Sequence, residues 1–212
     1  MTQALIFDCD GTLADTMPAH YQAWLEVLRP HGIDFPEDRF YAMGGMPTDK
    51  IVVELCGEAG KSFFWEPATG SQTLPRRCAA GEAGGLPTRI DVNALVRDKA
   101  LAFERKIGEV RPVEKVVEVA RAQRGKGPMA VASGGQRRMV EKTLAQIGVL
   151  DWFPVVVTAE DTRQHKPAPD VFLEAARRLG VEPAACIVYE DTDLGLQAAR
   201  RAGMRWVDVR RM

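Results

Sequence analysis

The sequence has no excess of charge of either sign and no long apolar run. Its 212 residues carry a formal net charge of −1 at pH 7, so no global charge attracts nucleic acid or an anionic membrane. No apolar run approaches the length that spans a bilayer. The first apolar stretch has no basic segment before it and ends in carboxylates, unlike a signal peptide. We therefore expect a globular cytoplasmic protein without nucleic-acid or membrane partners.

Cysteine is scarce and shows no recognisable pattern. The sequence contains Cys9, Cys56, Cys78 and Cys186, with no CxxC or zinc-like spacing. Cys9 and Cys186 lie in or beside apolar segments, where cysteine behaves as a small hydrophobic residue. We therefore expect a reduced protein. No internal repeat and no low-complexity tract is present either.

Short apolar runs and amphipathic segments alternate in the second half of the chain. Together with the run Ala4-Leu5-Ile6-Phe7, these apolar runs predict buried strands at 129–133, 155–158, 186–191 and 206–210. The spacing of apolar residues predicts helices at 136–147, 169–179 and 194–202, and Gly148, Gly180 and Gly203 mark where they end. This alternation predicts an α/β fold with a parallel sheet covered by helices on both faces.

The segment from about residue 15 to 110 shows helical patterns but no pattern typical of a strand. Apolar spacing predicts helices at 18–29 and 47–55, and a long helix from Asp91, its N-cap, to about 109. Residues 58–88 show no period, which suggests a mobile loop over a site or a poorly ordered insertion. With no strand expected here, this segment is interpreted as a helical cap inserted after the first strand of the core.

Side chains suited to chemistry follow several of the predicted strands. Because ligands of parallel sheets bind beyond the carboxyl ends of strands, we select a set from those ends and from the loop after the third strand. Ordinary structural roles remain open for several residues here. Asp8 and Asp10 could form a turn, Ser133 could cap the following helix, and Lys166 could be a solvated lysine. Asp193, close to the set, could be only the N-cap of the last helix. The selected residues are Asp8, Asp10, Ser133, Gly134, Gly135, Lys166, Glu190 and Asp191.

These residue types together suit the chemistry of a phosphate monoester. Like charges at Asp8 and Asp10 require a cation, and hard oxygen ligands from Asp8, Asp10, Glu190, Asp191 and a backbone carbonyl suit Mg²⁺. The Lys166 ammonium and the amides and hydroxyl of Ser133-Gly134 would bind the phosphate. Asp8 could then attack phosphorus as a nucleophile, while Asp10 serves as general acid and base.

In chain order these motifs resemble the haloacid dehalogenase superfamily. Asp-Cys-Asp-Gly-Thr at 8–12 is similar to its first motif, Ser133 to the second, Lys166 to the third and Glu190-Asp191 to the fourth. The resemblance implies a Rossmann-like core at 1–14 and 110–212 and a C1-type helical cap at 15–109. It also implies Asp8 as nucleophile, Asp10 as acid/base and Asp191 as a Mg²⁺ ligand. Because the dehalogenase branch lacks the second aspartate, Asp10 favours phosphoryl transfer.

Within the superfamily, the stretch 15–24 resembles the sugar-phosphate branch that includes β-phosphoglucomutase. The stretches 165–170 and 190–210 are most similar to the fructose-1-phosphate phosphatase-like members. Cap residues Thr16, His20, Gly45 and Thr48 would then face the sugar, although His20 could equally be a core or surface histidine. The mutase arginine that follows the cap glycine is absent, because Met46, Pro47 and Thr48 follow Gly45.

We therefore expect a Mg²⁺-dependent phosphatase of a small phosphorylated sugar, acting as a monomer or weak dimer. A phosphomutase, with Thr48 and Lys50 at a second phosphate site, and a non-catalytic phosphate-binding module are the alternatives. Asp10 argues against the non-catalytic module, because a protein that only binds phosphate needs no general acid or base.

Overall fold

The computed structural model describes residues 3–65 and 89–212. Most of the predicted irregular stretch, residues 66–88, lies outside the described residues. The chain divides by contacts into two compact units: Met1–Ala19, Gly44–Met46 and Lys106–Met212 form the first, and His20–Met43 and Pro47–Arg105 the second. The division assigns the short loop Gly44–Met46 to the first unit, whereas the sequence analysis assigned it to the cap.

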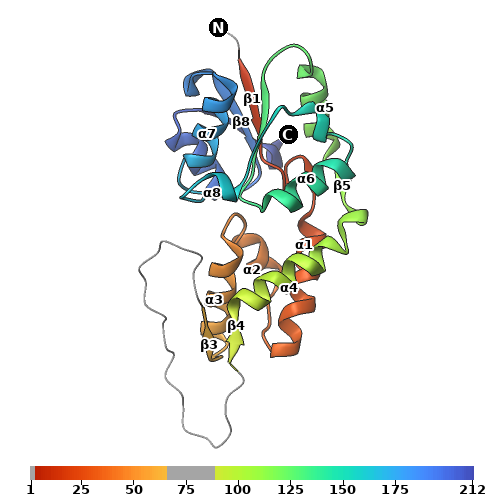
Figure 1. Cartoon of the computed structure of the whole chain (residues 1–212), viewed down its shortest axis with the longest axis vertical. Helices are drawn as coiled ribbons and strands as arrows, with labels where there is room; N and C mark the ends of the chain where they lie inside the picture. The colour runs from red at the N-terminus through yellow and green to blue at the C-terminus, as the bar shows by residue number, and fades with distance from the viewer. Residues whose placement is uncertain (1–2, 66–88) are drawn as a thin grey trace, which may run out of the picture. The chain divides into compact units, whose positions relative to one another are not determined.

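The first unit contains a five-stranded parallel sheet. Its strands are β1 (Ala4–Phe7), β6 (Met129–Ala132), β7 (Val155–Val157), β8 (Cys186–Glu190) and β9 (Arg205–Asp208), in the order β7-β6-β1-β8-β9. Figure 1 labels the neighbouring strands β1 and β8. Each neighbouring pair is parallel. The predicted α/β class is confirmed. Because β1 lies between β6 and β8, the strand order switches direction beside β1, where open sheets bind ligands.

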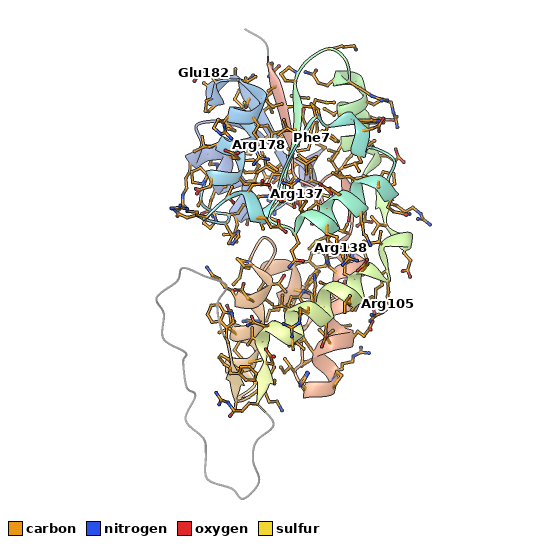
Figure 2. The ribbon with its side chains drawn as sticks, viewed as in Figure 1. Phe7, Arg105, Arg137, Arg138, Arg178 and Glu182 are labelled. Carbon is orange, nitrogen blue, oxygen red and sulfur yellow. The ribbon has the colours of Figure 1, made fainter. Side chains whose placement is uncertain are left out.

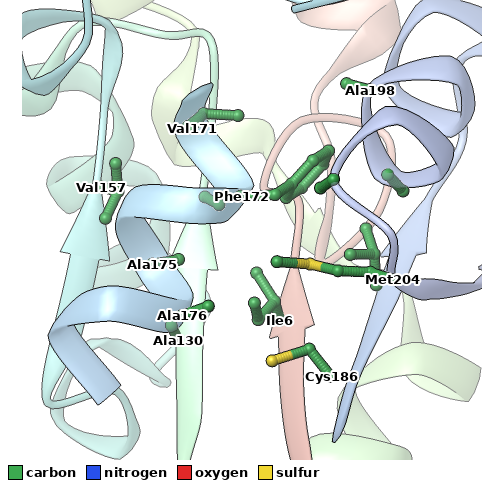
Figure 3. Packing of buried hydrophobic residues seen from close by; sticks show 14 of the residues in the cluster. Ile6, Ala130, Val157, Val171, Phe172, Ala175, Ala176, Cys186, Ala198 and Met204 are labelled. Atoms are coloured by element: carbon green, nitrogen blue, oxygen red, sulfur yellow. The ribbon is translucent and has the colours of Figure 1, made fainter. Parts of the chain in front are cut away.

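Helices cover both faces of this sheet. Phe7 of β1, labelled in Figure 2, packs with Val116 of α5 (Glu114–Gln123) and Leu144 of α6 (Arg137–Gln146) on one face. Ile6 points to the opposite face, where it packs with residues of α7 (Asp170–Leu179) and α8 (Asp193–Arg201), among them Phe172 (Figure 3). Neighbouring strand residues face opposite sides, so an uninterrupted apolar run is what a sheet buried on both faces requires.

The second unit is mainly helical. It contains most of α1 (Met17–Leu28), all of α2 (Glu37–Ala42), α3 (Thr48–Glu58) and α4 (Val92–Glu104). Asp91 caps α4 as expected, because its side chain accepts a hydrogen bond from the amide of Ala94 at 3.1 Å. The helix ends at Glu104, earlier than expected, and a 3-10 turn at Ile107–Glu109 follows.

The expectation that residues 15–110 contribute no strand is wrong in detail. Two-residue strands β3 (Phe63–Phe64) and β4 (Ile90–Asp91) pair in parallel. Further, β2 (Ala14–Asp15) pairs antiparallel with β5 (Arg111–Pro112). None of them joins the five-stranded sheet. These strands are too short for a periodic pattern to show. Among the described residues, no helix combines the length and hydropathy needed to cross a membrane.

Candidate active site

The backbone hydrogen bonds of the sheet bring the selected residues to one edge. Asp8 directly follows β1, and its amide donates to the carbonyl of Tyr189 in β8 at 3.0 Å. Ser133 directly follows β6, and its amide donates to the carbonyl of Val157 in β7 at 3.0 Å. These bonds extend the parallel pairing past the strand ends, so side chains far apart in sequence gather beyond their carboxyl ends.

Lys166 lies at the centre of a buried charged cluster. Its ammonium donates to Asp8 Oδ1 at 2.6 Å and to Glu190 Oε2 at 2.7 Å. The ring of Phe172 lies beneath the ammonium, with its centroid 5.1 Å from Nζ. Lys166 is only 7% exposed, so the alternative of an ordinary solvated lysine is wrong.

Glu190 is fully buried and hydrogen-bonded at both carboxylate oxygens. While Oε2 accepts from Lys166, Oε1 accepts from the amide of Thr192 at 2.9 Å, from its hydroxyl at 2.7 Å and from the amide of Asp191 at 3.2 Å. A Cβ on Gly195 would lie 2.0 Å from Glu190 Cδ. Glycine at 195 is therefore what lets this carboxylate lie against the first turn of α8.

Asp191 is held by the tight turn after β1. The amides of Leu13 and Ala14 both donate to the carbonyl of Cys9 at 3.0 Å, and the hydroxyl of Thr12 donates to Asp191 Oδ1 at 2.9 Å. Gly11 adopts a positive φ of 77°, and a Cβ there would lie 2.3 Å from Asp191 Oδ2. The Gly-Thr pair that follows the two aspartates thus holds the fourth motif in place.

Asp10 and Ser133 approach each other beside Gly135. A Cβ on Gly135 would lie 3.3 Å from Ser133 Oγ and 3.4 Å from Asp10 Oδ2. Ser133 Oγ accepts a hydrogen bond from the Gly135 amide at 3.0 Å. Ser133 does not cap the following helix, because Gln136 occupies the N-cap position of α6.

Asp193 is not a helix cap either. Thr192 is the N-cap of α8, and its hydroxyl accepts from the Gly195 amide at 3.1 Å. Asp193 is the first residue of the helix and pairs with Arg210 at 2.8 Å. Both capping expectations fail, because α6 begins only at Arg137, four residues after Ser133, and α8 begins at Asp193, one residue earlier than expected.

The site carries more negative charge than its single buried ammonium offsets. Burial raises the pKa of Asp8 well above its usual value, against the opposing effect of Lys166. Burial and the charge of Glu190 raise the pKa of Asp191 to about 7. Burial alone would lower the pKa of Lys166, but Asp8 and Glu190 raise it above the usual value, so the lysine remains protonated.

This surplus fits a bound divalent cation. Asp8, Glu190 and Asp191 each offer a carboxylate oxygen, and these oxygens lie within 4.8 Å of one another. Hard carboxylate oxygens in a small group suit Mg²⁺. Asp10, which the sequence analysis included among the ligands, is not part of this group of side chains.

The four cap candidates have distinct surroundings. Thr16 is fully buried, and its hydroxyl has no hydrogen-bond partner among the described residues. His20 stacks on Phe103, with ring centroids 3.7 Å apart. Gly45 adopts a positive φ of 84°, and a Cβ there would lie 3.3 Å from Thr192 Oγ1. Thr48 begins α3. Their contact with a sugar stays a prediction.

Lys99, a buried lysine of the second unit, was not among the residues predicted from the sequence. Its Nζ lies 2.8 Å from His20 Nδ1, and it lies over the rings of Trp24 and Phe103, 5.4 and 5.6 Å from their centroids. Lys99 is 9% exposed. It shares the buried face of α4 with Leu95 and Phe103, so a lysine at an apolar position of the helical pattern was the available signal.

The sheet order defines a Rossmann-like core with a buried cluster of carboxylates and lysine at its switch point. A family model described as haloacid dehalogenase-like hydrolase matches residues 2–203, and the chain belongs to this family. Fructose-1-phosphate phosphatase YqaB of Escherichia coli (strain K12) is 38% identical over 210 residues, covering 97% of this chain and 95% of the relative.

Two further comparisons involve mutases. β-Phosphoglucomutase of Bacillus subtilis (strain 168) is 25% identical over 209 residues, covering 98% of this chain and 83% of the relative. A crystal structure of β-phosphoglucomutase from Clostridium difficile matches with a TM-score of 0.76 at 22% identity, covering 97% of this chain and 83% of that one. The resemblance inferred from the four motifs is confirmed. The expected class of enzyme, a hydrolase of phosphate monoesters, is confirmed by the family and by the similarity to the fructose-1-phosphate phosphatase.

Proposed function

We propose that this protein hydrolyses a small sugar phosphate by a Mg²⁺-dependent route through an aspartyl phosphate on Asp8. The observation that carries the proposal is the buried Asp8–Lys166–Glu190 cluster with Asp191 beside it. A phosphate dianion could not approach these carboxylates without added positive charge. The 38% identity to a fructose-1-phosphate phosphatase supports a sugar phosphate as the substrate class.

Asp8 and Asp191 are the side chains best suited to hold the metal. Both oxygens of Glu190 are engaged by protein donors, whereas Asp8 Oδ1 accepts from Lys166 and keeps a lone pair for the metal, so the other Asp8 oxygen stays available for phosphorus. Bound Mg²⁺ would supply positive charge that offsets the carboxylates and the phosphoryl oxygens. Glu190 therefore serves chiefly to hold the Lys166 ammonium next to Asp8.

Residues of this chain carry out both chemical steps, the formation of the aspartyl phosphate and its hydrolysis. The free oxygen of Asp8 attacks phosphorus as the bond to the sugar oxygen breaks, and Asp10 donates a proton to that oxygen. Asp10 then accepts a proton from the water that attacks the aspartyl phosphate, which releases inorganic phosphate and restores Asp8. Throughout both steps Lys166 stays protonated, while Ser133 and Gly134 hold the phosphoryl oxygens by hydrogen bonds.

A phosphomutase is the second candidate, because the relatives include a β-phosphoglucomutase at 25% identity. A mutase returns a phosphoryl group to a sugar, so it must hold a second phosphate. The sequence Met46-Pro47-Thr48 after Gly45 offers no arginine for that purpose.

The deciding experiment incubates the enzyme with a panel of hexose and pentose phosphates in Mg²⁺. Inorganic phosphate and isomerised sugar phosphate are measured in the same samples. We expect stoichiometric phosphate release with no isomer. An isomer formed without net phosphate release would establish the mutase instead, and no change in any substrate would favour a binding module.

A further inference from the structure

Thr192 connects the first turn of α8 to the buried charged cluster. Its hydroxyl donates to Glu190 Oε1 at 2.7 Å and accepts from the Gly195 amide at 3.1 Å. Its own amide donates to the same Glu190 oxygen at 2.9 Å. One side chain thus uses its single proton on the carboxylate and its lone pair on the helix, which fixes its orientation.

Glu190 passes this constraint to Lys166. With Oε1 held by Thr192, Oε2 has a fixed direction in which to accept from the Lys166 ammonium at 2.7 Å. The same ammonium donates to Asp8 at 2.6 Å. Because Glu190 is fully buried, no solvent could replace a lost donor without rearrangement.

We propose that Thr192 is a positioning residue that fixes the Lys166 ammonium at Asp8 by orienting the Glu190 carboxylate. The proposal rests on the proposed phosphatase function. Thr192 touches neither Asp8 nor Lys166 in any described contact, so its effect would pass through Glu190. Loss of the hydroxyl removes the shortest of the three hydrogen bonds on Glu190 Oε1 and leaves only the amides of Asp191 and Thr192 there. The carboxylate then shifts, and the Lys166 ammonium moves away from Asp8 Oδ1.

The test compares Thr192→Val with Thr192→Ser, using p-nitrophenyl phosphate in Mg²⁺. Valine keeps the branched shape and removes the donor, while serine keeps the hydroxyl. We expect Thr192→Val to lower kcat by about tenfold or more with KM within about twofold, and serine to restore kcat to within about threefold. We expect kcat to change more than KM, because the displaced Lys166 ammonium affects the reactivity of the Asp8 carboxylate more than the binding of the substrate.

Thr143→Val is the matched control. Thr143 is also a buried threonine of the first unit, but its hydroxyl has no hydrogen-bond partner among the described residues. This substitution should leave kcat and KM unchanged. Because Thr192 also caps α8, urea unfolding measures the stability of each variant, and Thr192→Gly provides a variant with little loss of capping.

The proposal is overturned if Thr192→Val or Thr192→Gly keeps kcat within about twofold of Thr143→Val, a difference below one hydrogen bond. It is also overturned if Thr192→Ser loses as much kcat as the valine variant, since the hydroxyl would then be irrelevant. A wild-type enzyme that hydrolyses no phosphate monoester would instead refute the proposed function.

Discussion

Asp8 is buried and shares the Lys166 ammonium with the Glu190 carboxylate. Its chemistry depends on how far this positive charge offsets the negative charges around it. Lys166 contacts one of its oxygens, and in the proposed function the other attacks phosphorus. Asp10 lies two residues further along the chain, near Ser133 and Gly135. The two aspartates therefore have different neighbours although the sequence places them almost side by side, and different neighbours favour different roles.

Substitution of the two aspartates should separate these roles. Asp8→Asn should abolish turnover of every substrate, because an amide oxygen is a poor nucleophile. Asp10→Asn should lower kcat on a sugar phosphate by about 10²–10⁴-fold, and lower it less on p-nitrophenyl phosphate, whose leaving group needs no proton. Steady-state rates on both substrates provide the check. Equal losses on the two substrates would remove Asp10 from the role of general acid.

Gly11 offers a test of how Asp191 is held. Gly11→Ala places a methyl group 2.3 Å from the present position of Asp191 Oδ2, so the carboxylate must move. We expect the Mg²⁺ concentration for half-maximal activity to rise by about tenfold or more, the loss usual for a displaced supporting contact.

Gly148→Ala is the control for this variant. Gly148 has a similar φ of 73°, so alanine bears the same backbone strain, but a Cβ there meets nothing within 4 Å. Its Mg²⁺ dependence should match that of the wild type. Equal Mg²⁺ dependence in the two variants would show that the clash with Asp191 is unimportant.

Helices and strands with long apolar patterns were predictable, and short elements were not. The strand at Cys186–Glu190 and the helix at Asp170–Leu179 agree with the expected ranges to within one residue at each end. Helix α2 covers only Glu37–Ala42, and β3 pairs only Phe63–Phe64, which is too little for a period to show. Tertiary pairing determines such elements.

The candidate site was predictable where it follows strand ends. Asp8, Ser133 and Glu190 follow or end buried strands, so parallel pairing alone brings them together. The partners of Glu190 were not predictable, because the role of Thr192 depends on the exact residue at which α8 begins. Lys99 was not predicted, because the sequence does not show that the aromatic rings of Trp24 and Phe103 would cover its ammonium.

An ion-pair network joins α6, α7 and the 3-10 turn η4 (Ala159–Asp161). Asp161 accepts hydrogen bonds from Arg178 at 2.8 Å and from the amide and hydroxyl of Thr158 at 2.8 and 3.0 Å, and it also pairs with Arg137. Figure 2 marks Arg137 and Arg178. Although burial opposes ionisation, these donors lower the pKa of Asp161 to about 2.

This network should affect how the free energy of unfolding changes with pH in the acid range. Because the folded pKa lies below the unfolded value, Asp161 stabilises the protein above about pH 4 and loses this contribution as the pH falls towards 2. Asp161→Asn should therefore lower the free energy of unfolding at pH 7 by on the order of 2 kcal/mol, and by less at pH 3. Urea unfolding at both pH values measures the difference.

Asp151→Asn is the control for this experiment. Asp151 pairs with Arg124 at 3.1 Å, but its side chain is 73% exposed, so the pair should contribute little. A penalty for Asp161→Asn that is constant from pH 7 to pH 3 would contradict the assigned role of the network.

The charge surplus should make the stability of the entire protein depend on a divalent cation. Binding to the folded state alone adds about 2.7 kcal/mol when the ligand is at 100 times its Kd. We expect Mg²⁺ to raise the melting temperature over that in EDTA, and Asp191→Asn to reduce this shift strongly. Thermal melts monitored by circular dichroism measure it. An undiminished shift in Asp191→Asn would place the cation elsewhere.

The covalent intermediate is tested most directly by acid-quenching the enzyme during turnover of a sugar phosphate in Mg²⁺ and analysing its peptides by mass spectrometry. The peptide that contains Asp8 should carry one phosphoryl group that hydroxylamine removes, as expected of an acyl phosphate. Samples in EDTA and the Asp8→Asn variant should lack this group and release no phosphate. Phosphate release by Asp8→Asn at the wild-type rate, or a phosphoryl group on a different residue, would contradict Asp8 as the nucleophile.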